Sequence, residues 1–450
     1  MSVRRSLATP KRSISIIGAG LGGLTLGCAL KARGIPCVIY ERKPSATGGG
    51  TRHGYTITLF PERISTGEPR TQSLPSLLGK HLDWATVRGV IGVGSGTNIG
   101  GQGAIHQTTL SAYERDKKVP NPFRAYRATL ESLLSRRLDI RWNAKLSDIR
   151  QTEGHRPVLM FEDGSKIISS YVIAADGVHS QVRKSLLPSL EPTVLPFVVF
   201  NGRRRMPKAA YRKIYQRNFR GATTLDLLNR DGVRLQLALN EARKDNTQSA
   251  IELSYTYSRQ ARENDRLHRP DRRVEDAVNI PDEFYNAIAQ LHLPEGPFAD
   301  AFDVEKVKND RILHWLMRVT EAHVMDDLVV EQLSDIAARG IYFMGDAVHA
   351  HPIVGGYGAN LAIADALHLS AELERRIKHS VTPETESYLQ QPTDFYRQRI
   401  TSWRESIKDA LHNIYKMHNT DHIRSPHSEY RKAKVAAKLS QVNLSRGKYQ

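Results

Sequence analysis

Cysteine is scarce in this sequence: the 450 residues include only Cys28 and Cys37. Two cysteines cannot form a disulfide framework or a cysteine-based metal site, and such usage favours a reducing compartment. The sequence also lacks any apolar run of about eighteen residues, so we predict no membrane span. Together these absences exclude a disulfide-stapled secreted domain and an integral membrane protein, and we expect a cytoplasmic protein.

Acidic residues are also in deficit, with 47 against 65 basic residues and a formal net charge of +18. Such an excess raises the hypothesis of a nucleic-acid partner. However, the charge is scattered, with local clusters at Arg203–Arg205 and after Asn419, and no zinc, helix-turn-helix or aromatic–basic RNA motif accompanies it. We therefore expect no nucleic-acid partner and interpret the charge as a surface that attracts a phosphorylated cofactor or keeps the protein in solution.

A glycine-rich turn near the amino terminus is the most informative stretch. Residues 13–17 are typical of a strand buried on both faces, and Gly18, Gly20 and Gly23 follow in G-x-G-x-x-G spacing before an apolar helix that Gly34 can end. In a dinucleotide site the first glycine permits the tight turn, the second lets the backbone approach a pyrophosphate, and the third lets helix and strand pack closely. The alternative is a glycine turn that binds nothing.

The following strand favours the dinucleotide interpretation. Residues 36–40 are apolar and end in Glu41, which lies 23 positions after Gly18 (41 − 18). A carboxylate at about this distance binds the ribose in dinucleotide-binding folds. Strand, glycine turn, helix, strand and acid occur in the required order, so we predict a dinucleotide site without assigning the nucleotide.

Two later strands also end in a carboxylate. The strand predicted over 167–175 leads into Asp176-Gly177, and the strand predicted over 340–344 leads into Gly345-Asp346. Ligands of α/β sheets bind at the carboxyl ends of the strands, although Asp176 taken alone is equally compatible with an ordinary turn. A glycine cluster at 355–358 then precedes a predicted helix with an apolar face.

The middle of the chain has a different pattern. Leucines recur at helical spacing after Arg127, whereas four alternating strands without long helices follow within 193–318. We predict an α/β fold with four segments: the first part of the nucleotide-binding domain at 11–192, an antiparallel β domain at 193–318, the second part of the first domain at 319–378, and a helical region with a basic tail at 379–450.

Taken together, these motifs resemble the single-component FAD-dependent monooxygenases with the p-hydroxybenzoate hydroxylase fold. The resemblance rests on the glycine turn with Glu41, the Arg-x-x-Leu-x-x-x-Leu run from Arg127, Asp176-Gly177 with Arg183, and the segment from Gly345-Asp346 to Asn360. It implies a Rossmann-like FAD-binding domain, an inserted antiparallel-sheet substrate domain and a helical C-terminal region.

The resemblance also implies roles for individual residues. The three glycines would hold the FAD pyrophosphate, Glu41 the adenosine ribose and Asp346 the ribityl–pyrophosphate region, while the helix start near Asn360 would stabilise the negative charge of the reduced flavin ring. The complete implied set of cofactor-binding residues is Gly18, Gly20, Gly23, Glu41, Arg42, Arg52, Arg127, Asp176, Asp346, Pro352, Gly355, Gly356, Gly358, Ala359 and Asn360. No catalytic residue can be assigned, and Tyr255 and Tyr257 are either substrate-side aromatics or plain strand packing.

The implied reaction is the hydroxylation of an electron-rich aromatic, phenolic or indole-like molecule through a flavin C4a-hydroperoxide. FAD would be the cofactor, with NADPH or NADH and O2 as co-substrates, in secondary metabolism or aromatic catabolism, and the protein would be a monomer or homodimer. An epoxidase, a Baeyer–Villiger oxygenase and a non-catalytic FAD-binding protein remain alternatives. A halogenase is set aside because Trp315 stands alone, without the Trp-x-Trp-x-Ile-Pro motif, and we predict no metal site because His349 and His351 lack a third ligand motif.

Overall fold

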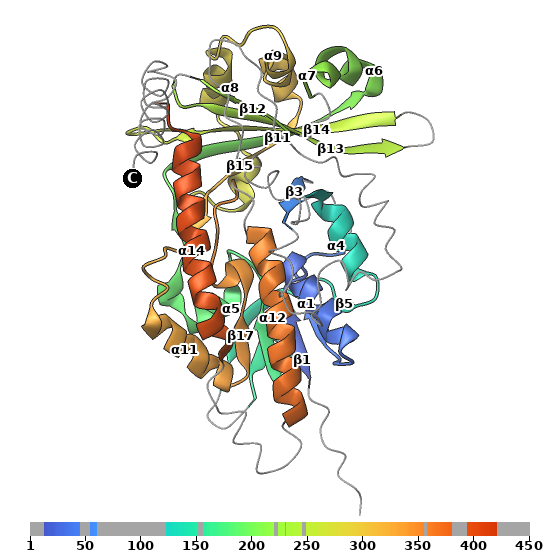
Figure 1. Cartoon of the computed structure of the whole chain (residues 1–450), viewed down its shortest axis with the longest axis vertical. Coiled ribbons are helices and arrows are strands. Elements are labelled where there is room, and N and C mark those ends of the chain that lie inside the picture. The colour runs from blue at the N-terminus through green and yellow to red at the C-terminus, as the bar shows by residue number, and fades with distance from the viewer. Residues whose placement is uncertain are drawn as a thin grey trace, which may run out of the picture. The chain divides into compact units, whose positions relative to one another are not determined.

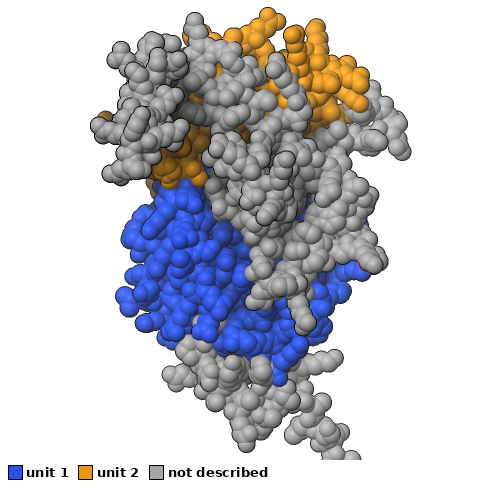
Figure 2. Space-filling model, in the orientation of Figure 1, with its two compact units in different colours: residues 1–93, 117–195, 317–411 blue, residues 94–116, 196–316, 412–450 orange. Residues whose placement is uncertain are grey.

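Two compact units make up the chain in the computed structural model, whose elements are labelled in Figure 1 and whose units are coloured in Figure 2. Unit 1 comprises residues 1–93, 117–195 and 317–411, and unit 2 comprises residues 94–116, 196–316 and 412–450. The structure describes residues 13–45, 55–60, 123–151, 156–219, 224–229, 231–244, 249–354, 358–379 and 394–420. Within this part of the chain, no helix combines the length and apolarity needed to cross a membrane.

A five-stranded parallel sheet forms the centre of unit 1. Its order is β17-β9-β1-β2-β5, and its strands are β1 (Ile14–Ile17), β2 (Val38–Tyr40), β5 (Asp139–Arg141), β9 (Tyr171–Ala174) and β17 (Ile341–Phe343). The residues of β1, β9 and β17 are all buried, as expected for parallel strands covered on both faces. Parallel pairing of apolar strands thus brings segments more than 300 positions apart in sequence into one sheet.

Four of these strands end in one row. Ala174 pairs with both Phe343 and Ile17, and Ile17 pairs with Tyr40. The residues that follow the row carry the motifs recognised in the sequence, because Gly18 follows β1, Glu41 follows β2, and an aspartate lies just beyond each of the other two strands. Because the strands end in register, the motifs that follow them lie at the same edge of the sheet.

Helices and small sheets complete unit 1. The helices are α1 (Leu21–Ala32), α4 (Arg127–Ser135), α5 (Gln181–Leu186), the 3-10 turn η4 (Pro188–Leu190), α11 (Asp327–Ala338), the 3-10 turn η7 (Gly345–Ala347), α12 (Gly358–His379) and α14 (Asp394–Met417), whose last turns belong to unit 2. Helices α1 and α12 pack side by side (Figure 1). The smaller sheets are β3 (Thr56–Leu59) with β4 (Phe123–Tyr126), β6 (Leu146–Arg150) with β7 (Val158–Phe161) and β8 (Lys166–Ile168), and β10 (Thr193–Val194) with β16 (Arg318–Val319).

Unit 2 is built on an antiparallel sheet of order β12-β13-β14-β11-β15. The strands are β11 (Phe197–Pro207), β12 (Thr224–Leu228), β13 (Arg234–Lys244), β14 (Ser249–Gln260) and β15 (Arg311–Trp315). Its helical segments are α6 (Lys208–Tyr211), the π-helical η5 (Arg212–Gln216), α7 (Arg217–Phe219), the 3-10 turn η6 (Glu275–Val278), α8 (Asp282–Ala289), α9 (Pro297–Ala301) and α10 (Val304–Lys308). Several of these helices lie along one face of the sheet (Figure 1).

The two faces of this sheet differ in chemistry. One face contributes Phe200, Leu237, Leu253 and Tyr255 to an apolar core shared with α8 and α9. Because side chains alternate along a strand, the neighbours of these residues point to the opposite face. That second face is polar and buried, with hydrogen-bonded side chains such as Arg234 with Asp226 and Asn240 with Glu252 and Ser254.

The predicted mixed α/β fold is confirmed, with local differences. The single strand predicted over 167–175 is in fact two strands, β8 and β9, separated by Ser169 and Ser170. Ser169 is buried and bonds to Ser15, so the chain changes sheets where a polar pair replaces the apolar pattern. The position of Cys28 in α1 and of Cys37 just before β2 would suit full burial, but both are only partly buried, and α11 was not predicted at all. The predicted domain boundaries are not tested by the division into units and stay a prediction.

Candidate functional site

The glycine turn has the close packing that its spacing predicts. Gly18 has φ +105°, and a methyl group there would lie 2.5 Å from the carbonyl oxygen of Ala175, whereas one on Gly23 would lie 2.1 Å from the carbonyl oxygen of Gly18. Gly20 is different, because the position of its missing Cβ is open within 4 Å. The missing side chains of Gly18 and Gly23 therefore permit the close backbone packing of the turn, and that of Gly20 leaves room for another molecule to approach the backbone.

The amino terminus of α1 has no side-chain cap. Gly20 occupies the N-cap position without a capping hydrogen bond, and the first turn contains no acidic residue. Unpaired N–H groups at the start of a helix attract anions, and the helix dipole adds to this attraction. The turn can therefore accept a phosphate group beside Gly20.

Glu41 is hydrogen-bonded to the backbone of this turn. Its carboxylate is buried and accepts hydrogen bonds from the backbone N–H of Ala19, at 2.7 Å, and from that of Lys43, at 3.1 Å. Glu41 therefore joins the end of β2 to the glycine turn of β1. Arg42, the next residue in the predicted set, is exposed.

Asp176 lies beside the glycine turn at the end of β9. Its Cα would be 2.9 Å from a methyl group on Gly18. One carboxylate oxygen accepts from the backbone N–H of Gln181 at 2.7 Å, whereas Oδ1 is buried without a hydrogen-bond partner among the described residues. Burial raises the pKa of this carboxyl above its usual value, and hydrogen bonds from Ser180 and from α5 offset part of that effect.

Asp346 occupies the corresponding place after β17. Gly345 turns the chain with φ +59°, and Oδ1 of Asp346 is buried with no hydrogen-bond partner in the described part of the chain. Burial raises the pKa of this carboxyl, and the nearby His349, Arg127 and Arg183 only partly oppose the rise. A buried acceptor without a partner is costly in a folded protein unless it serves a ligand.

Arg183 joins the two aspartate motifs. This buried side chain donates from NH1 to the carbonyl oxygen of Ala347 at 3.1 Å and from NH2 to that of Val178 at 2.8 Å. The sequence reasoning noted Arg183 in the Asp-Gly motif but did not include it in the candidate site. Its only signal was its place after the Asp-Gly motif, because α5 is mostly polar and a basic residue there also fits a solvated charge.

The start of α12 approaches Asp346. A methyl group on Gly358 would lie 3.3 Å from Oδ1 of Asp346, and Ala359 follows as the second residue of the helix. The buried Asn360 donates to the carbonyl oxygen of Thr58 and accepts from the N–H of Phe60, so its amide binds the backbone around β3. Pro352 is buried, whereas Arg52, Gly355 and Gly356 of the predicted set lie outside the described residues.

Arg127 is held at the start of α4 by neighbouring side chains. Its guanidinium donates to Glu131 at 2.8 Å and to the hydroxyl of Tyr55, and it lies over the Tyr55 ring. Burial alone would lower the pKa of Arg127, but Tyr55 and Glu131 raise it above the usual value. Arg127 therefore carries a fixed positive charge whose field reaches Asp346.

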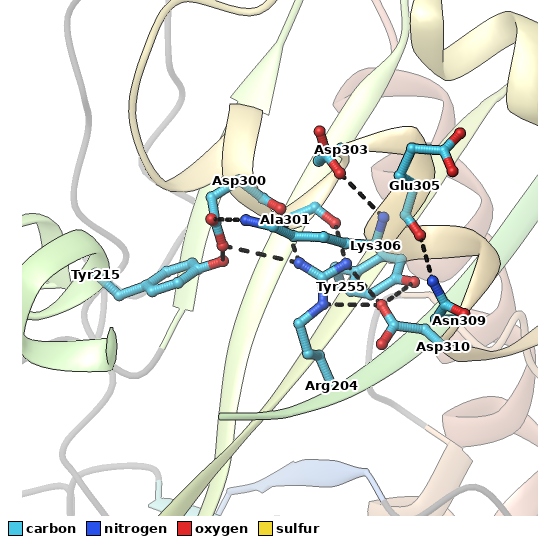
Figure 3. Close-up of polar contacts among 10 residues, drawn as sticks. All are labelled: Arg204, Tyr215, Tyr255, Asp300, Ala301, Asp303, Glu305, Lys306, Asn309 and Asp310. Atoms are coloured by element: carbon cyan, nitrogen blue, oxygen red, sulfur yellow. Dashed lines mark hydrogen bonds and ion pairs between the residues drawn. The ribbon is translucent and has the colours of Figure 1, made fainter. Parts of the chain in front are cut away.

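The two tyrosines singled out in unit 2 are packing residues. Tyr255 and Tyr257 are both buried in the apolar core between the sheet and its helices. The Tyr255 hydroxyl donates to Asp310 at 2.9 Å, within a cluster around Arg204 that also contains Asp300 and Tyr215 (Figure 3). The ring of Tyr255 crosses Gly202 of β11 so closely that a methyl group there would lie 2.0 Å from it.

Comparison with known proteins identifies the family. A model of the FAD binding domain family matches residues 11–201 and 308–401, which is more than half of the chain. The FAD-dependent monooxygenase nscC of Neosartorya fischeri is 30% identical over 378 residues, covering 80% of this chain and 86% of that protein. The chain belongs to the FAD-dependent monooxygenases. The enzyme is therefore an oxidoreductase, and the non-catalytic alternative is set aside.

Other relatives agree with this assignment. The FAD-dependent monooxygenase aptC of Emericella nidulans is 27% identical over 432 residues, covering 90% of this monooxygenase and 95% of aptC. Among solved structures, Klebsiella pneumoniae HpxO complexed with FAD and uric acid matches with a TM-score of 0.60 at 17% identity, over 94% of this chain and 92% of HpxO. The 2,6-dihydroxypyridine-3-hydroxylase of Arthrobacter nicotinovorans matches with a TM-score of 0.61 at 16% identity, over 92% and 93% of the two chains. The predicted p-hydroxybenzoate hydroxylase fold is confirmed.

The residues of the monooxygenase fit the cofactor of its family. FAD needs an approach to backbone N–H groups for its pyrophosphate and polar acceptors for its hydroxyl groups. The open position at Gly20, the uncapped α1 and the unpartnered Oδ1 of Asp346 provide these features along one sheet edge. Among the described residues, no group of three or more His, Cys, Asp or Glu side chains is arranged to hold a metal ion.

Proposed function

We propose that this monooxygenase uses NADPH or NADH and O2 to hydroxylate an electron-rich aromatic small molecule. The observation that carries the proposal is the row of strand ends in unit 1, where Gly18, Glu41, Asp176 and Asp346 follow neighbouring parallel strands. Ligands of such sheets bind at this edge. Bound FAD would supply electron transfer from the nicotinamide and the activation of dioxygen.

The chain's own residues would bind and orient the cofactor. We assign the pyrophosphate to the start of α1, where free N–H groups and the helix dipole favour negative charge. The carboxylate of Glu41 would exchange its bond to the turn for an adenosine ribose hydroxyl. Oδ1 of Asp346 would accept a hydrogen bond from a hydroxyl group of the cofactor. This bond would remove the desolvation penalty of burying that oxygen without a partner.

The start of α12 would face the flavin ring. Gly358, Ala359 and Asn360 open this helix of 22 residues. Its N–H groups and dipole would stabilise the negative charge of reduced flavin by up to about 2 kcal/mol in a partly buried place. The amide of Asn360 would keep β3 beside the helix through its two backbone bonds.

We propose a polar aromatic substrate. HpxO is complexed with uric acid, and the Arthrobacter neighbour is named as a dihydroxypyridine hydroxylase. Two proteins of the same fold are thus linked by name to electron-rich aromatic rings. Unit 2 of this protein also has a buried polar sheet face, but its Arg234 and Asn240 are bonded to neighbouring side chains, so we assign no substrate contact to them. Tyr255 and Tyr257 are not part of this proposal because both are committed to the core on the other face.

The decisive experiment is a turnover assay with purified protein. Candidate phenols and indoles are added with FAD, and the oxidation of NADPH and of NADH is followed at matched concentrations. We expect one candidate class to stimulate nicotinamide oxidation and to yield a product that carries one oxygen atom from 18O2. A lactone or an epoxide as the only product would replace hydroxylation by a Baeyer–Villiger or epoxidation outcome, and unstimulated oxidation that yields only peroxide with every aromatic would refute the substrate class.

A further inference from the structure

A single buried carboxylate, Asp365 of α12, collects four hydrogen bonds. Its Oδ2 accepts from the backbone N–H of Gly345 at 2.9 Å and from Nε2 of His349 at 2.5 Å. Its Oδ1 accepts from Nε of Arg399 at 3.0 Å and from Nε1 of Trp403 at 2.9 Å. Asp365 and His349 are fully buried, so every acceptor site of this carboxylate is used inside the protein.

The charge of this carboxylate is balanced within the group. Burial alone would raise the pKa of Asp365, but His349 and Arg399 together with the donors lower it well below its usual value. The carboxylate is therefore ionised at neutral pH and holds its donors by charge-assisted hydrogen bonds, which are stronger than neutral ones. Neither His349 nor Asp365 has a role in the proposed reaction.

Helix α14 reaches the same segment by a third contact. The hydroxyl of Tyr396 accepts a hydrogen bond from the backbone N–H of Phe343 at 2.8 Å. Since β17 is an edge strand of the parallel sheet, this contact satisfies a donor on its open side. Tyr396, Arg399 and Trp403 are spaced i, i+3 and i+7, so one face of α14 makes all three contacts.

The segment held in this way carries Asp346. Phe343 precedes it by three residues and Gly345 by one, and Gly345 turns with φ +59°. Fixing the N–H groups of Phe343 and Gly345, which both lead into this turn, sets the direction of the Asp346 side chain, whose Oδ1 is left without a partner in the described structure. A preorganised acceptor binds its ligand more tightly than one that must first be ordered.

We propose that α14 is a functional part of the flavin site: Tyr396, Arg399 and Trp403 are positioning residues that fix Asp346 for FAD, acting through Phe343 and Asp365. This inference rests on the proposed function, because it takes Asp346 to be a contact of FAD. None of the three side chains contacts the cofactor in this account, and their effect passes through the backbone around Gly345.

The test compares FAD binding and protein stability in hydrogen-bond deletions that keep the shape of the helix. Tyr396→Phe and Trp403→Phe each remove one hydrogen bond, and Arg399→Met removes the charged donor. We expect apoprotein reconstitution, followed by flavin fluorescence, to give an FAD Kd about fivefold to tenfold higher for each aromatic variant and about thirtyfold higher for Arg399→Met. Arg399→Lys should recover most of that affinity because a lysine can donate to the same Asp365 oxygen.

Arg404→Gln is the matched control. Arg404 lies on the same helix but bonds to the carbonyl oxygen of Met325 and to Asp327, so its loss should not change the FAD Kd. Equal FAD affinity in Trp403→Phe, Arg399→Met and wild type would overturn the proposal. So would equal losses of melting temperature in the apo and FAD-bound forms, because they would indicate a purely structural helix.

The failure of this inference is separable from that of the proposed function. Asp346→Ala is measured in the same series. If Asp346→Ala loses FAD while the α14 variants bind it normally, only the positioning role is wrong. If Asp346→Ala also binds FAD as tightly as wild type, the assignment of Asp346 to the cofactor is itself wrong.

Discussion

Two buried polar clusters in this protein contrast in how completely they are paired. In unit 1, the cluster at the strand ends contains Asp176 and Asp346, each with a buried carboxylate oxygen that has no hydrogen-bond partner among the described residues. In unit 2, the cluster around Arg204 pairs its buried polar atoms with one another (Figure 3).

The Arg204 cluster is a hydrogen-bonded network that connects separate elements of unit 2. The guanidinium donates to Asp310 and to the backbone carbonyl oxygens of Asp300 and Ala301. Tyr215 and Lys306 both donate to the Asp300 carboxylate. Strand β11 is thereby joined to α9 and to the start of β15.

The difference shows how a site can be told from a structural network. Buried polar groups in native proteins are normally paired, so an unpaired acceptor at the sheet edge where ligands bind is a candidate contact for another molecule. The Arg204 cluster is complete and should support stability alone. The strand-end cluster is incomplete and should support binding, so substitutions in the two clusters should have opposite signatures.

The largest expected effect is a loss of stability from Arg204→Leu. This change leaves Asp310 and two carbonyl oxygens buried without their donor, which typically costs about 3–5 kcal/mol. Urea unfolding should show the loss, while the FAD Kd of the folded protein stays at the wild-type value. A large change in FAD affinity without a change in stability would reverse the roles of the two clusters.

Next in size is the loss of FAD binding from Asp346→Ala. We expect the Kd to rise about a hundredfold, because a buried charge-assisted hydrogen bond is lost, which corresponds to about 2.7 kcal/mol. The apoprotein should change little in stability, since the substitution removes a buried carboxylate oxygen that has no partner together with one backbone hydrogen bond from His351. Flavin absorbance of the purified variant and its apo melting temperature measure the two effects, and full yellow colour would contradict the assignment.

A smaller effect is expected from Gly20→Ala. The added methyl group meets no atom within 4 Å, so the apoprotein should fold normally and lose at most about 1 kcal/mol at the N-cap. The same methyl group would stand where the pyrophosphate approaches, and we expect the FAD Kd to rise about tenfold. Gly34→Ala is the control for adding a methyl group at the other end of α1, because Gly34 also has open space but a positive φ of +73°. Gly34→Ala should therefore lower stability and leave FAD affinity unchanged.

The smallest effect concerns acid stability. Burial lowers the pKa of His418 from its ordinary value of 6.5 to about 4, and its ring bonds to Ser258 and to the carbonyl oxygen of Ile414. Between these two pH values the unfolded chain binds a proton that the folded protein excludes, so stability falls as the pH drops from about 6.5 to about 4. His418 accounts for about 1 kcal/mol of this loss between pH 6.5 and 5.5.

Replacing His418 tests how much of the acid-dependent loss of stability it causes. His418→Gln should lose stability at neutral pH but show a shallower decline with acid in urea unfolding. Burial and two arginines lower the pKa of His314 to about 3. The decline of stability with acid that remains in His418→Gln should come from His314. An unchanged slope in His418→Gln would show that His418 does not titrate as stated.

The sequence predicted the parts of the site whose residues lie close together in the chain. The turn at Gly18, the helix ending at Gly34 and the strand before Glu41 follow from local spacing, and the structure confirms the local folds. Each aspartate was found because an apolar strand ended just before it. The roles of these residues toward the cofactor stay predictions.

The contacts between distant segments could not be predicted from the sequence. Asp365 lies among apolar residues of a helix, which signals a buried carboxylate but not its partners Arg399 and Trp403, about 35 residues later. Tyr255 alternates on its strand with polar residues, so its spacing indicated a sheet without indicating which face would be covered by helices. Local spacing sets secondary structure, whereas these pairings depend on packing between elements.

The position of β17 at the edge of its sheet has a consequence for biosynthesis. A ribosome releases β1, β2 and β9 long before residues 341–343 emerge, so the inner strands can pair while the last strand is still absent. The row that ends in Phe343, Ala174, Ile17 and Tyr40 becomes complete only after three quarters of the chain has been translated. A nascent chain that ends between β9 and β17 presents three of the four strand ends and leaves one edge of β9 open, so it stays exposed to misassembly until β17 emerges.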